Sequence, residues 1–410
     1  MRGFFIALGA LILLRALTKM PHSFILRLLY LLNLVVPKKN IVVMDSYPDC
    51  EDQLIALLRW LSEHDQRRQV KVFFFVSGDV SAVELNMTRL VGAYTETVTI
   101  LSKRSLRAFW VYVRAKTIFY THGLYGYFSP PGSQCVINLW HGMPVKGIWK
   151  AISDDLIPRA NYLCSTSSKF SGILAGVSGV PRNNIVLTGL PRNDVFFKKR
   201  KAVKDFFDQI HKTADRTVMF LPTFRASNIG EMETDGIEAG DPLGMGDADL
   251  ARLLQLLEQY NVRVFVKPHP MSIHYGRVYD VGNISVIDDA WLLKRGITLY
   301  EMLSGVDALI TDISSVYVDF LITRRPCFCF FPDVDAYRKS RNFLLDPIES
   351  YIPSELYRTG SELIDAISVF LAGDDRFVDK RNHLAELLNP QEQDDACARV
   401  FALAGFKLND

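Results

Sequence analysis

Short apolar runs alternate with segments of helical spacing along most of this chain, and this alternation restricts the fold more than any other feature. Strands separated by helices predict parallel sheets, in which functional side chains lie beyond the carboxyl ends of the strands. The apolar runs that predict strands are residues 41–44, 70–76, 117–121, 161–165, 185–188, 218–221, 262–266, 308–311 and 327–331. Helical spacing is clear at 54–61 and indicated at 109–113. The fold class is therefore α/β.

A charged stretch at residues 198–204 separates two halves that both show this pattern. A chain of 410 residues is long enough for two or three domains of ordinary size. We therefore predict an N-terminal domain over residues 37–197, a C-terminal domain over 198–390 and a terminal helix over 391–410.

The composition excludes some classes of protein. With 49% hydrophobic and 22% charged residues, the chain can bury a full core and is not largely disordered. A net charge of +2, without zinc-finger spacing, an RNA-recognition signature or a long basic helix, argues against a nucleic-acid partner. The six cysteines are scattered and lie mostly inside apolar runs, which predicts buried thiols in a reducing compartment.

The segment 1–36 is unusual, because it contains two apolar runs interspersed with basic residues, namely Arg15, Lys19 and Arg27. Each run is shorter than the roughly 20 apolar residues that a membrane-spanning helix needs. Such sequences are typical of helices that lie in the membrane interface and are attracted to anionic lipid. We expect this segment to be a membrane-associating helical segment. A spanning anchor, a signal peptide and a structural helical hairpin are the alternatives.

Residues 308–320, ALITDISSVYVDF, combine a buried strand with small polar residues and the start of a helical pattern. Asp312, Ser314 and Ser315 follow the strand directly. A strand that feeds such a helix start presents free backbone N–H groups, which can hold a phosphate or diphosphate. The alternative is that Asp312 or Ser314 only caps the helix.

Two histidines follow apolar runs in the first half. His141 lies between Trp140 and Gly142, in a loop where glycine lets the backbone bend. A histidine there can titrate near neutral pH and take a proton from an attacking hydroxyl. A structural role beside the tryptophan is the alternative, and His122, which follows another predicted strand, carries the same ambiguity.

Basic residues follow two strands of the second half. Arg225 comes shortly after one strand, while Lys267 and His269 follow the next, where prolines flank the histidine. If these side chains converge with Ser314 and Ser315, they neutralise a diphosphate, and phosphoryl transfer depends mostly on such positioning and charge stabilisation.

Taken in order, these segments resemble the CDP-glycerol glycerophosphotransferase family, which includes the teichoic-acid glycerophosphate primases and polymerases. The resemblance is carried by NLWHGMPVKGI at 138–148, TGLPRND at 188–194, LPTFR at 221–225, VKPHP at 266–270, LITDISSVYVDF at 309–320 and RRPCFCFFPDVDAYRKSRNFLLD at 324–346. It covers roughly the last two thirds of the chain. It implies a GT-B-like pair of Rossmann-like domains whose parallel sheets face each other across a cleft, with the nucleotide donor on the C-terminal domain.

The resemblance also implies roles for individual residues. His141 matches the family's proposed catalytic base, and His269 matches a second essential histidine near the donor phosphates. The residues implied on the donor side are Arg225, Lys267, Asp312, Ser314, Ser315 and Asp319, and those on the acceptor side are His122 and Gly142. No metal site is implied by a motif, although Mg²⁺ can accompany the nucleotide donor.

The function implied is transfer of glycerol phosphate from CDP-glycerol to a hydroxyl of a cell-surface polymer or lipid-linked acceptor, with release of CMP. This is teichoic-acid-like or capsular polymer synthesis at the cytoplasmic face of the membrane, by a peripheral enzyme. The alternatives are a GT-B glycosyltransferase that uses a nucleotide sugar, a CDP-ribitol-dependent ribitolphosphotransferase, and a non-catalytic assembly factor.

Overall fold

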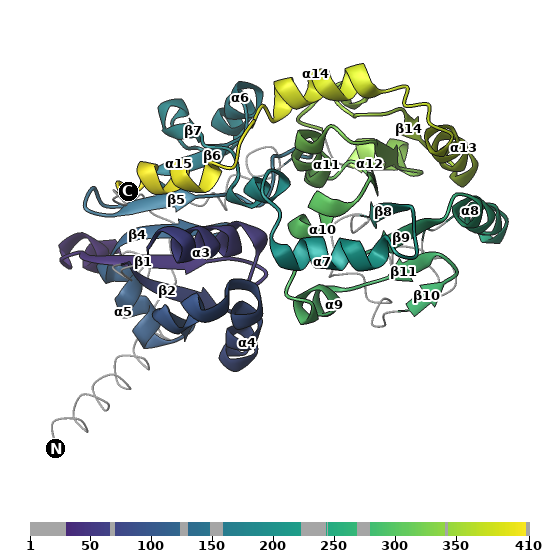
Figure 1. Ribbon diagram of the computed structural model, residues 1–410. Coiled ribbons are helices and arrows are strands. Elements are labelled where there is room, and N and C mark those ends of the chain that lie inside the picture. The colour runs from purple at the N-terminus through teal and green to yellow at the C-terminus, as the bar shows by residue number, and fades with distance from the viewer. Residues whose placement is uncertain are drawn as a thin grey trace.

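The computed structural model describes residues 30–65, 70–123, 130–147, 159–222, 243, 245–268, 279–340 and 343–406. These residues form two α/β halves, each built around one sheet (Figure 1). The predicted α/β class with parallel sheets is confirmed.

The first sheet has seven strands in the described residues, in the order β3-β2-β1-β4-β5-β6-β7. Neighbouring strands all run parallel. The order 3-2-1-4-5-6 is that of a doubly wound sheet, and its carboxyl edge is the usual place for a ligand. The strands are β1 (Lys39–Asp45), β2 (Lys71–Val76), β3 (Val98–Ser102), β4 (Ala115–Tyr120), β5 (Cys135–Asn138), β6 (Tyr162–Ser165) and β7 (Ile185–Leu187).

Helices cover both faces of this sheet, because successive side chains of a buried strand point to opposite faces. One face packs with α3 (Asp52–His64), α4 (Val80–Val91) and α6 (Ser168–Val177) in a large apolar cluster. The other face packs on α5 (Leu106–Arg114), whose Ala108, Val111 and Tyr112 are buried there.

The second sheet also has seven strands in the described part of the chain, in the order β10-β11-β9-β8-β12-β13-β14. Neighbouring strands are parallel, except that β10 runs antiparallel to β11. Without β10 this is again the doubly wound order. The strands are β8 (Arg216–Leu221), β9 (Val262–Val266), β10 (Tyr279–Val281), β11 (Ile284–Val286), β12 (Ala308–Thr311), β13 (Cys327–Phe330) and β14 (Leu356–Tyr357).

The remaining helices of the described residues follow β7 in the sequence. They are α7 (Lys201–Ile210), α8 (Asp247–Gln259), α9 (Asp289–Lys294), α10 (Leu299–Gly305), α11 (Ser315–Phe320), α12 (Val334–Ser340), α13 (Gly360–Leu371), α14 (Val378–Leu388) and α15 (Ala396–Leu403). A cluster of Val218, Phe220, Leu253 and Leu363 packs one face of the sheet against α8 and α13. The opposite face joins the large cluster of the first half, so the two halves share one apolar core.

The end of the chain returns to the first half. Figure 1 shows α14 leaving the second half and α15 lying beside α3. Phe401 of α15 stacks on Trp60 of α3 at 4.8 Å between ring centroids. The carboxylate of Asp194 accepts hydrogen bonds from the backbone N–H groups of Ala396 and Cys397, at 3.1 and 2.9 Å. These contacts tie the last helix to the first half.

Every strand predicted from an apolar run overlaps an observed strand, whereas β3, β5, β10, β11 and β14 were not among the predicted strands. All six cysteines are free thiols, and four of them are buried. In the parts of the chain that the structure describes, no helix has both the length and the apolar character needed to cross a bilayer. The membrane-associating segment predicted at 1–36 lies outside the described residues except for residues 30–36, of which 30–35 are helical.

Candidate functional site

The loop after β5 contacts the start of α11, and this contact joins the two halves at the carboxyl edges of their sheets. An ideal Cβ on Gly142 would overlap Ser315 Oγ and lie 3.0 Å from Arg192 Nη2, so a side chain has no room there. Gly142 also has a φ of +137°, which strongly favours glycine. The structure thus brings together two segments that the sequence placed in separate motifs.

The two predicted histidines of the first half lie against each other. The rings of His122 and His141 are stacked, with centroids 4.1 Å apart and an angle of 11° between their planes. Trp140 contacts the His141 ring at 3.9 Å, and Tyr47 meets His122 edge-on at 5.8 Å. The hydroxyl of Thr121 lies 2.9 Å from His122 Nδ1. The loops after β1, β4 and β5 therefore form one aromatic and imidazole cluster.

Both histidines are neutral at neutral pH in this arrangement. Desolvation, followed by His122 and Arg192, lowers the pKa of His141 to about 3. Desolvation, followed by Lys103 and Arg192, lowers the pKa of His122 to about 4. The expectation that His141 titrates near neutral pH is therefore wrong for the ligand-free protein. Nδ1 of His141 is buried and has no hydrogen-bond partner among the described residues, so no hydrogen bond from this nitrogen fixes the orientation of the ring.

The serines at the start of α11 differ in their roles. Ser314 is the N-cap of α11, and its hydroxyl accepts a hydrogen bond of 3.5 Å from the backbone N–H of Val316. The capping alternative is therefore confirmed for Ser314. Ser315 is the first helical residue, and its hydroxyl is the group that approaches Gly142. Of the two, Ser315 is the one at the boundary between the halves.

The two predicted aspartates of this segment are both buried. Asp312 ends the strand segment, and one of its oxygens lies 3.9 Å from Lys146 Nζ, which also sits over the ring of Tyr337. Lys146 comes from the loop after β5, so this ion pair is another link between the two halves. Asp312 therefore lies near the predicted phosphate position and is held there by a cation of the opposite half.

Asp319 is the centre of a buried polar network. Its carboxylate accepts hydrogen bonds from Arg192 Nη2 at 2.7 Å, Asn193 Nδ2 at 3.0 Å and Tyr300 Oη at 2.6 Å. Arg192 also pairs with Glu51 at 3.0 Å, and its guanidinium lies 4.2 Å from the centre of the Tyr300 ring. Because both oxygens of Asp319 bond to protein groups, this side chain holds the halves together.

Arg192 and Glu51 were not identified as functional from the sequence. Desolvation raises the pKa of Glu51 to about 7, although Arg192 offsets part of the effect. Arg192 stands inside the TGLPRND segment, which was the available signal. Arg192 lies against both Asp319 and the Gly142 loop, so it adjoins the predicted site.

A second group that the sequence did not single out lies at the ends of β1 and β3. Asp45 is buried, and its oxygen lies 3.5 Å from Lys103 Nζ. Desolvation raises the pKa of Asp45 to about 7, with Lys103 opposing the shift and Asp49 adding to it. The backbone carbonyl of Asp45 accepts a hydrogen bond from the N–H of Thr121, next to His122. This group thus borders the histidine cluster.

Lys267 follows β9 and is buried, and its ammonium pairs with Asp289 at 2.9 Å. Its charge is therefore directed towards the start of α9. Arg225 and His269 lie outside the described residues. The structure brings together His122, His141, Gly142, Asp312 and Ser315, and among the described candidates it does not place Lys267 in that group.

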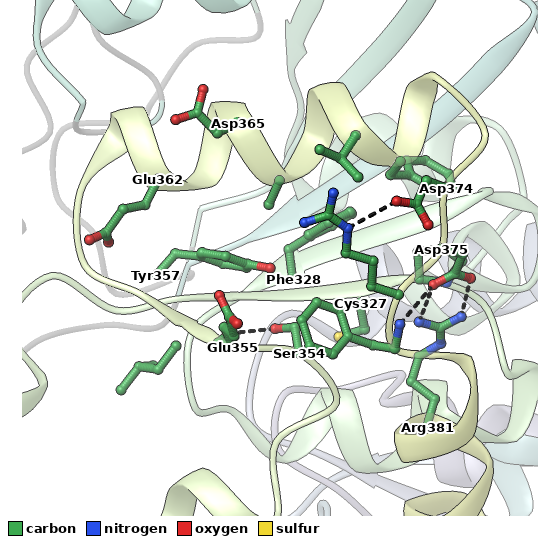
Figure 2. A pocket seen from close by; sticks show the side chains of 17 residues that line it. Cys327, Phe328, Ser354, Glu355, Tyr357, Glu362, Asp365, Asp374, Asp375 and Arg381 are labelled. Atoms are coloured by element: carbon green, nitrogen blue, oxygen red, sulfur yellow. Dashed lines mark hydrogen bonds and ion pairs between the residues drawn. The ribbon is translucent and has the colours of Figure 1, made fainter.

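No group of three or more histidine, cysteine or acidic side chains in the described residues is arranged to hold a metal ion. A pocket of about 370 Å³ does exist, but it lies between β13, β14 and α13. Figure 2 shows its aromatic walls, Phe328 and Tyr357, and the Asp375 and Arg381 side chains paired with each other. None of the predicted site residues lines this pocket.

Two doubly wound sheets, with polar side chains gathered where their carboxyl edges meet, define an α/β protein of the doubly wound class. Residues 28–404 match the family described as CDP-glycerol:poly(glycerophosphate) glycerophosphotransferase. The chain belongs to this family, so it is a transferase of the glycerophosphotransferase class. The match begins at residue 28, so the likeness extends further toward the N-terminus than the motifs indicated.

The relatives include a teichoic acid glycerol-phosphate transferase from Staphylococcus aureus, 23% identical over 393 residues, which cover 89% of this chain and 92% of that protein. A teichoic acid ribitol-phosphate primase from Bacillus spizizenii is 25% identical over 59% of this chain, and the match spans 62% of that primase, less than two thirds of its length.

Solved structures show the same fold. The wall teichoic acid polymerase TagF superposes with a TM-score of 0.69 at 18% identity, covering 90% of this chain and 89% of that one. A UDP-GlcNAc 2-epimerase from Neisseria meningitidis, bound to UDP-GlcNAc, superposes with a TM-score of 0.53 at 9% identity, covering 88% of this chain and 98% of that one. At these identities the likeness concerns the fold alone.

Proposed function

We propose that this protein transfers glycerol phosphate from CDP-glycerol to a hydroxyl of a teichoic-acid-like polymer or its lipid-linked precursor, and that it releases CMP. The observation that carries the proposal is the contact between the His141–Gly142 loop and Ser315. Through this contact, the loop that carries His141 in one half lies against the segment of the other half that the family resemblance assigns to the donor diphosphate. The names of the relatives support the glycerol phosphate donor and the teichoic acid product.

His141 is the proposed general base. Its neutral ring takes the proton from the acceptor hydroxyl as the oxygen attacks the phosphorus next to glycerol. The bond from that phosphorus to the bridging oxygen of the diphosphate breaks, and the electron pair leaves with CMP. The negative charge of a bound diphosphate raises the pKa of a nearby imidazole, so donor binding makes His141 a stronger base than it is in the free enzyme.

The donor side is proposed to lie on residues 198–390 and the acceptor side on 37–197, which is a GT-B-like arrangement. Ser315 and Ser314 are assigned to the diphosphate, with Asp312 and its partner Lys146 beside them. His269, Arg225 and Lys267 are assigned to the leaving CMP by the family resemblance.

His122 is assigned to the acceptor side because it stacks on the face of His141. In that position it keeps water from one face of the base and borders the space that an incoming hydroxyl must enter.

The enzyme is proposed to act at the cytoplasmic face of the membrane as a peripheral protein, held by residues 1–36. The apolar runs and basic residues of this segment support the proposal. Deleting residues 1–36 should release the protein from anionic vesicles while transfer to a soluble acceptor analogue continues. A truncated protein that still sediments with the vesicles would show that attachment does not depend on this segment.

The decisive experiment measures CMP release by the purified protein from CDP-glycerol, CDP-ribitol and a panel of nucleotide sugars. CDP-ribitol is included because ribitol-phosphate enzymes are among the relatives, and nucleotide sugars because of the likeness in fold to the epimerase. CDP-glycerol should be the preferred donor. Preference for either of the others would replace the proposed donor.

His141→Ala provides the test of mechanism. It should lose about 10²- to 10⁴-fold in turnover, the usual contribution of a general base, while its affinity for CDP-glycerol stays the same. The matched control is His64→Ala, because His64 is an exposed histidine on α3 that also stacks on a tryptophan, Trp60. A variant with full turnover would rule out His141 as the base.

A further inference from the structure

Helix α5 has an outward face that is both apolar and cationic. Leu106 and Trp110 are 59% and 50% exposed, although both are large apolar side chains. Arg107 is exposed on the same helix, and Arg114 lies with its guanidinium 5.5 Å from the centre of the Trp110 ring. Positions 106, 107, 110 and 114 follow helical spacing and form one stripe. We call this stripe the α5 face.

The segment that contains the α5 face carries charge of one sign. Residues 103–116 contain five cations, Lys103, Arg104, Arg107, Arg114 and Lys116, and no carboxylate. The opposite side of α5 is buried against the first sheet. Lys103 pairs with Asp45, whereas Arg104, Arg107 and Lys116 are exposed to solvent. A tryptophan and a leucine among arginines are the side chains that a protein presents to the headgroup region of a bilayer.

A second exposed apolar group lies at the far end of this helix. Leu31, Leu34 and Val35 are exposed, and the segment that carries them is fixed to the end of α5. Lys38 Nζ donates a hydrogen bond of 2.7 Å to the carbonyl of Val113 and another of 2.7 Å to Asn33 Oδ1. The residues that precede this segment in the sequence are the most apolar of the chain. Both apolar groups are therefore attached to the same helix.

The first turn of α5 borders the acceptor side of the proposed site. Ser105 caps α5, and Lys103 just before it pairs with Asp45 at the end of β1. Lys103 is also close enough to His122 to lower its pKa. Figure 1 shows α5 on the outer side of the first half, away from the second sheet. A surface that meets the α5 face therefore also lies close to the histidine cluster.

We propose that the α5 face, together with Leu31, Leu34 and Val35, docks on an anionic lipid bilayer and so holds the acceptor side of the site next to the membrane. This inference rests on the proposed function for its purpose, since a lipid-linked acceptor must reach His141 from the bilayer. Its physical basis is independent, because the exposed apolar side chains and the cations complement an anionic lipid surface whatever reaction takes place.

The test measures co-sedimentation of the full-length protein with vesicles of phosphatidylcholine alone, or with about one third phosphatidylglycerol. Leu106→Glu combined with Trp110→Glu should weaken partition at least about tenfold, because both apolar contacts are replaced by charges that anionic lipid repels. The control is Leu187→Glu, because Leu187 is also 50% exposed but lies on β7 at the other edge of the sheet. The control should bind as the wild type does.

A second pair of variants tests the cations. Arg104→Gln with Arg107→Gln should weaken partition about 30-fold on the anionic vesicles only, since each cation contributes about 1 kcal/mol near such a surface. The control with the same change in net charge is Lys201→Gln with Lys204→Gln, both exposed on α7 in the other half. If the two double variants lose vesicle partition equally, net charge and not the α5 face determines binding. That result would overturn the proposal.

The conservative variant Trp110→Phe gives a readout that does not depend on folding. Vesicles with brominated acyl chains should quench the wild-type tryptophan fluorescence, and this quenching should largely disappear in Trp110→Phe. Quenching that is unchanged in Trp110→Phe would overturn the proposal. Glutamate variants that bind vesicles as the wild type does would also overturn it. So would glutamate variants with a lower free energy of unfolding, because that loss would indicate that another part of the protein covers this face.

Transfer to a soluble acceptor analogue, measured on the same proteins, separates the two proposals. Vesicle binding that is lost while this transfer continues supports the docking surface. If the wild type transfers nothing from any donor, the proposed function fails, whereas the vesicle results still decide whether the α5 face binds lipid.

Discussion

Asp319 provides the sharpest test of how the two halves are held together. Its side chain is fully buried and accepts hydrogen bonds from Arg192 and Asn193 of the first half and Tyr300 of the second. Replacing it by alanine removes the acceptor for three buried donors at once. We expect this single change to destabilise the whole protein, because the apolar core is shared between the halves.

The magnitude follows from the contacts. Removing one partner of a buried ion pair costs about 3–5 kcal/mol, because the other charge stays buried without its counterion. Glu51 still pairs with Arg192 in the variant. The loss in the free energy of unfolding expected for Asp319→Ala is therefore at the lower end of that range, about 3 kcal/mol. Asp319→Asn keeps one acceptor oxygen but loses the charge, so we expect about 1.5–3 kcal/mol, the usual value of hydrogen bonds to a charged group.

The assay is urea unfolding, with the free energy taken from the midpoint and the slope. The control is Asp365→Ala, which removes the partner of Arg252 from a pair in which both side chains are about half exposed. Such surface pairs contribute less than about 1 kcal/mol. If Asp319→Ala is no less stable than this control but loses its affinity for CDP-glycerol, then Asp319 is a donor ligand and our account of the network is wrong.

Three further predictions concern the site. The pKa of His141 is lowered to about 3 in the free enzyme, so its neutral form persists as the pH falls, and kcat/KM should stay flat to below about pH 5. Bound diphosphate raises that pKa, so the acid limb of kcat should lie at higher pH, and coincident limbs in the two profiles would contradict this. Gly142→Ala should lose at least about tenfold in turnover because its Cβ would meet Ser315 Oγ, whereas Gly176→Ala, with nothing within 4 Å, should not. Ser315→Ala should weaken CDP-glycerol binding by about 1–3 kcal/mol in isothermal titration, and unchanged affinity would remove Ser315 from the donor site.

The periodicity of the sequence predicted most of the strands, because a strand buried on both faces is a short continuous apolar run. The strands that it missed have weaker signals. β3 contains threonine and serine among its five residues, and β14 has only two residues. Strand order could not be predicted at all, since nothing in the run at 115–120 indicates that it pairs with β1 and not with β3.

The candidate site was predicted in part, and for a physical reason. His141 and Ser315 each follow a strand, and parallel sheets place such residues at the same edge, so their proximity could be anticipated. The role of Arg192 could not, because its partners Glu51 and Asp319 are far away in the sequence and only the fold buries them together. The low pKa of His141 was missed for the same reason, since it depends on burial and on the His122 ring.

The return of α15 to the first half has a consequence for synthesis of the chain on the ribosome. Trp60 and Asp194 belong to the first half, yet the groups that cover them are Phe401 and the backbone of Ala396 and Cys397. During translation this surface of the first half therefore stays uncovered until the last helix has left the ribosome. A fragment that stops before residue 396 should expose an apolar patch around α3 and aggregate, even though all the strands of both sheets are present in it.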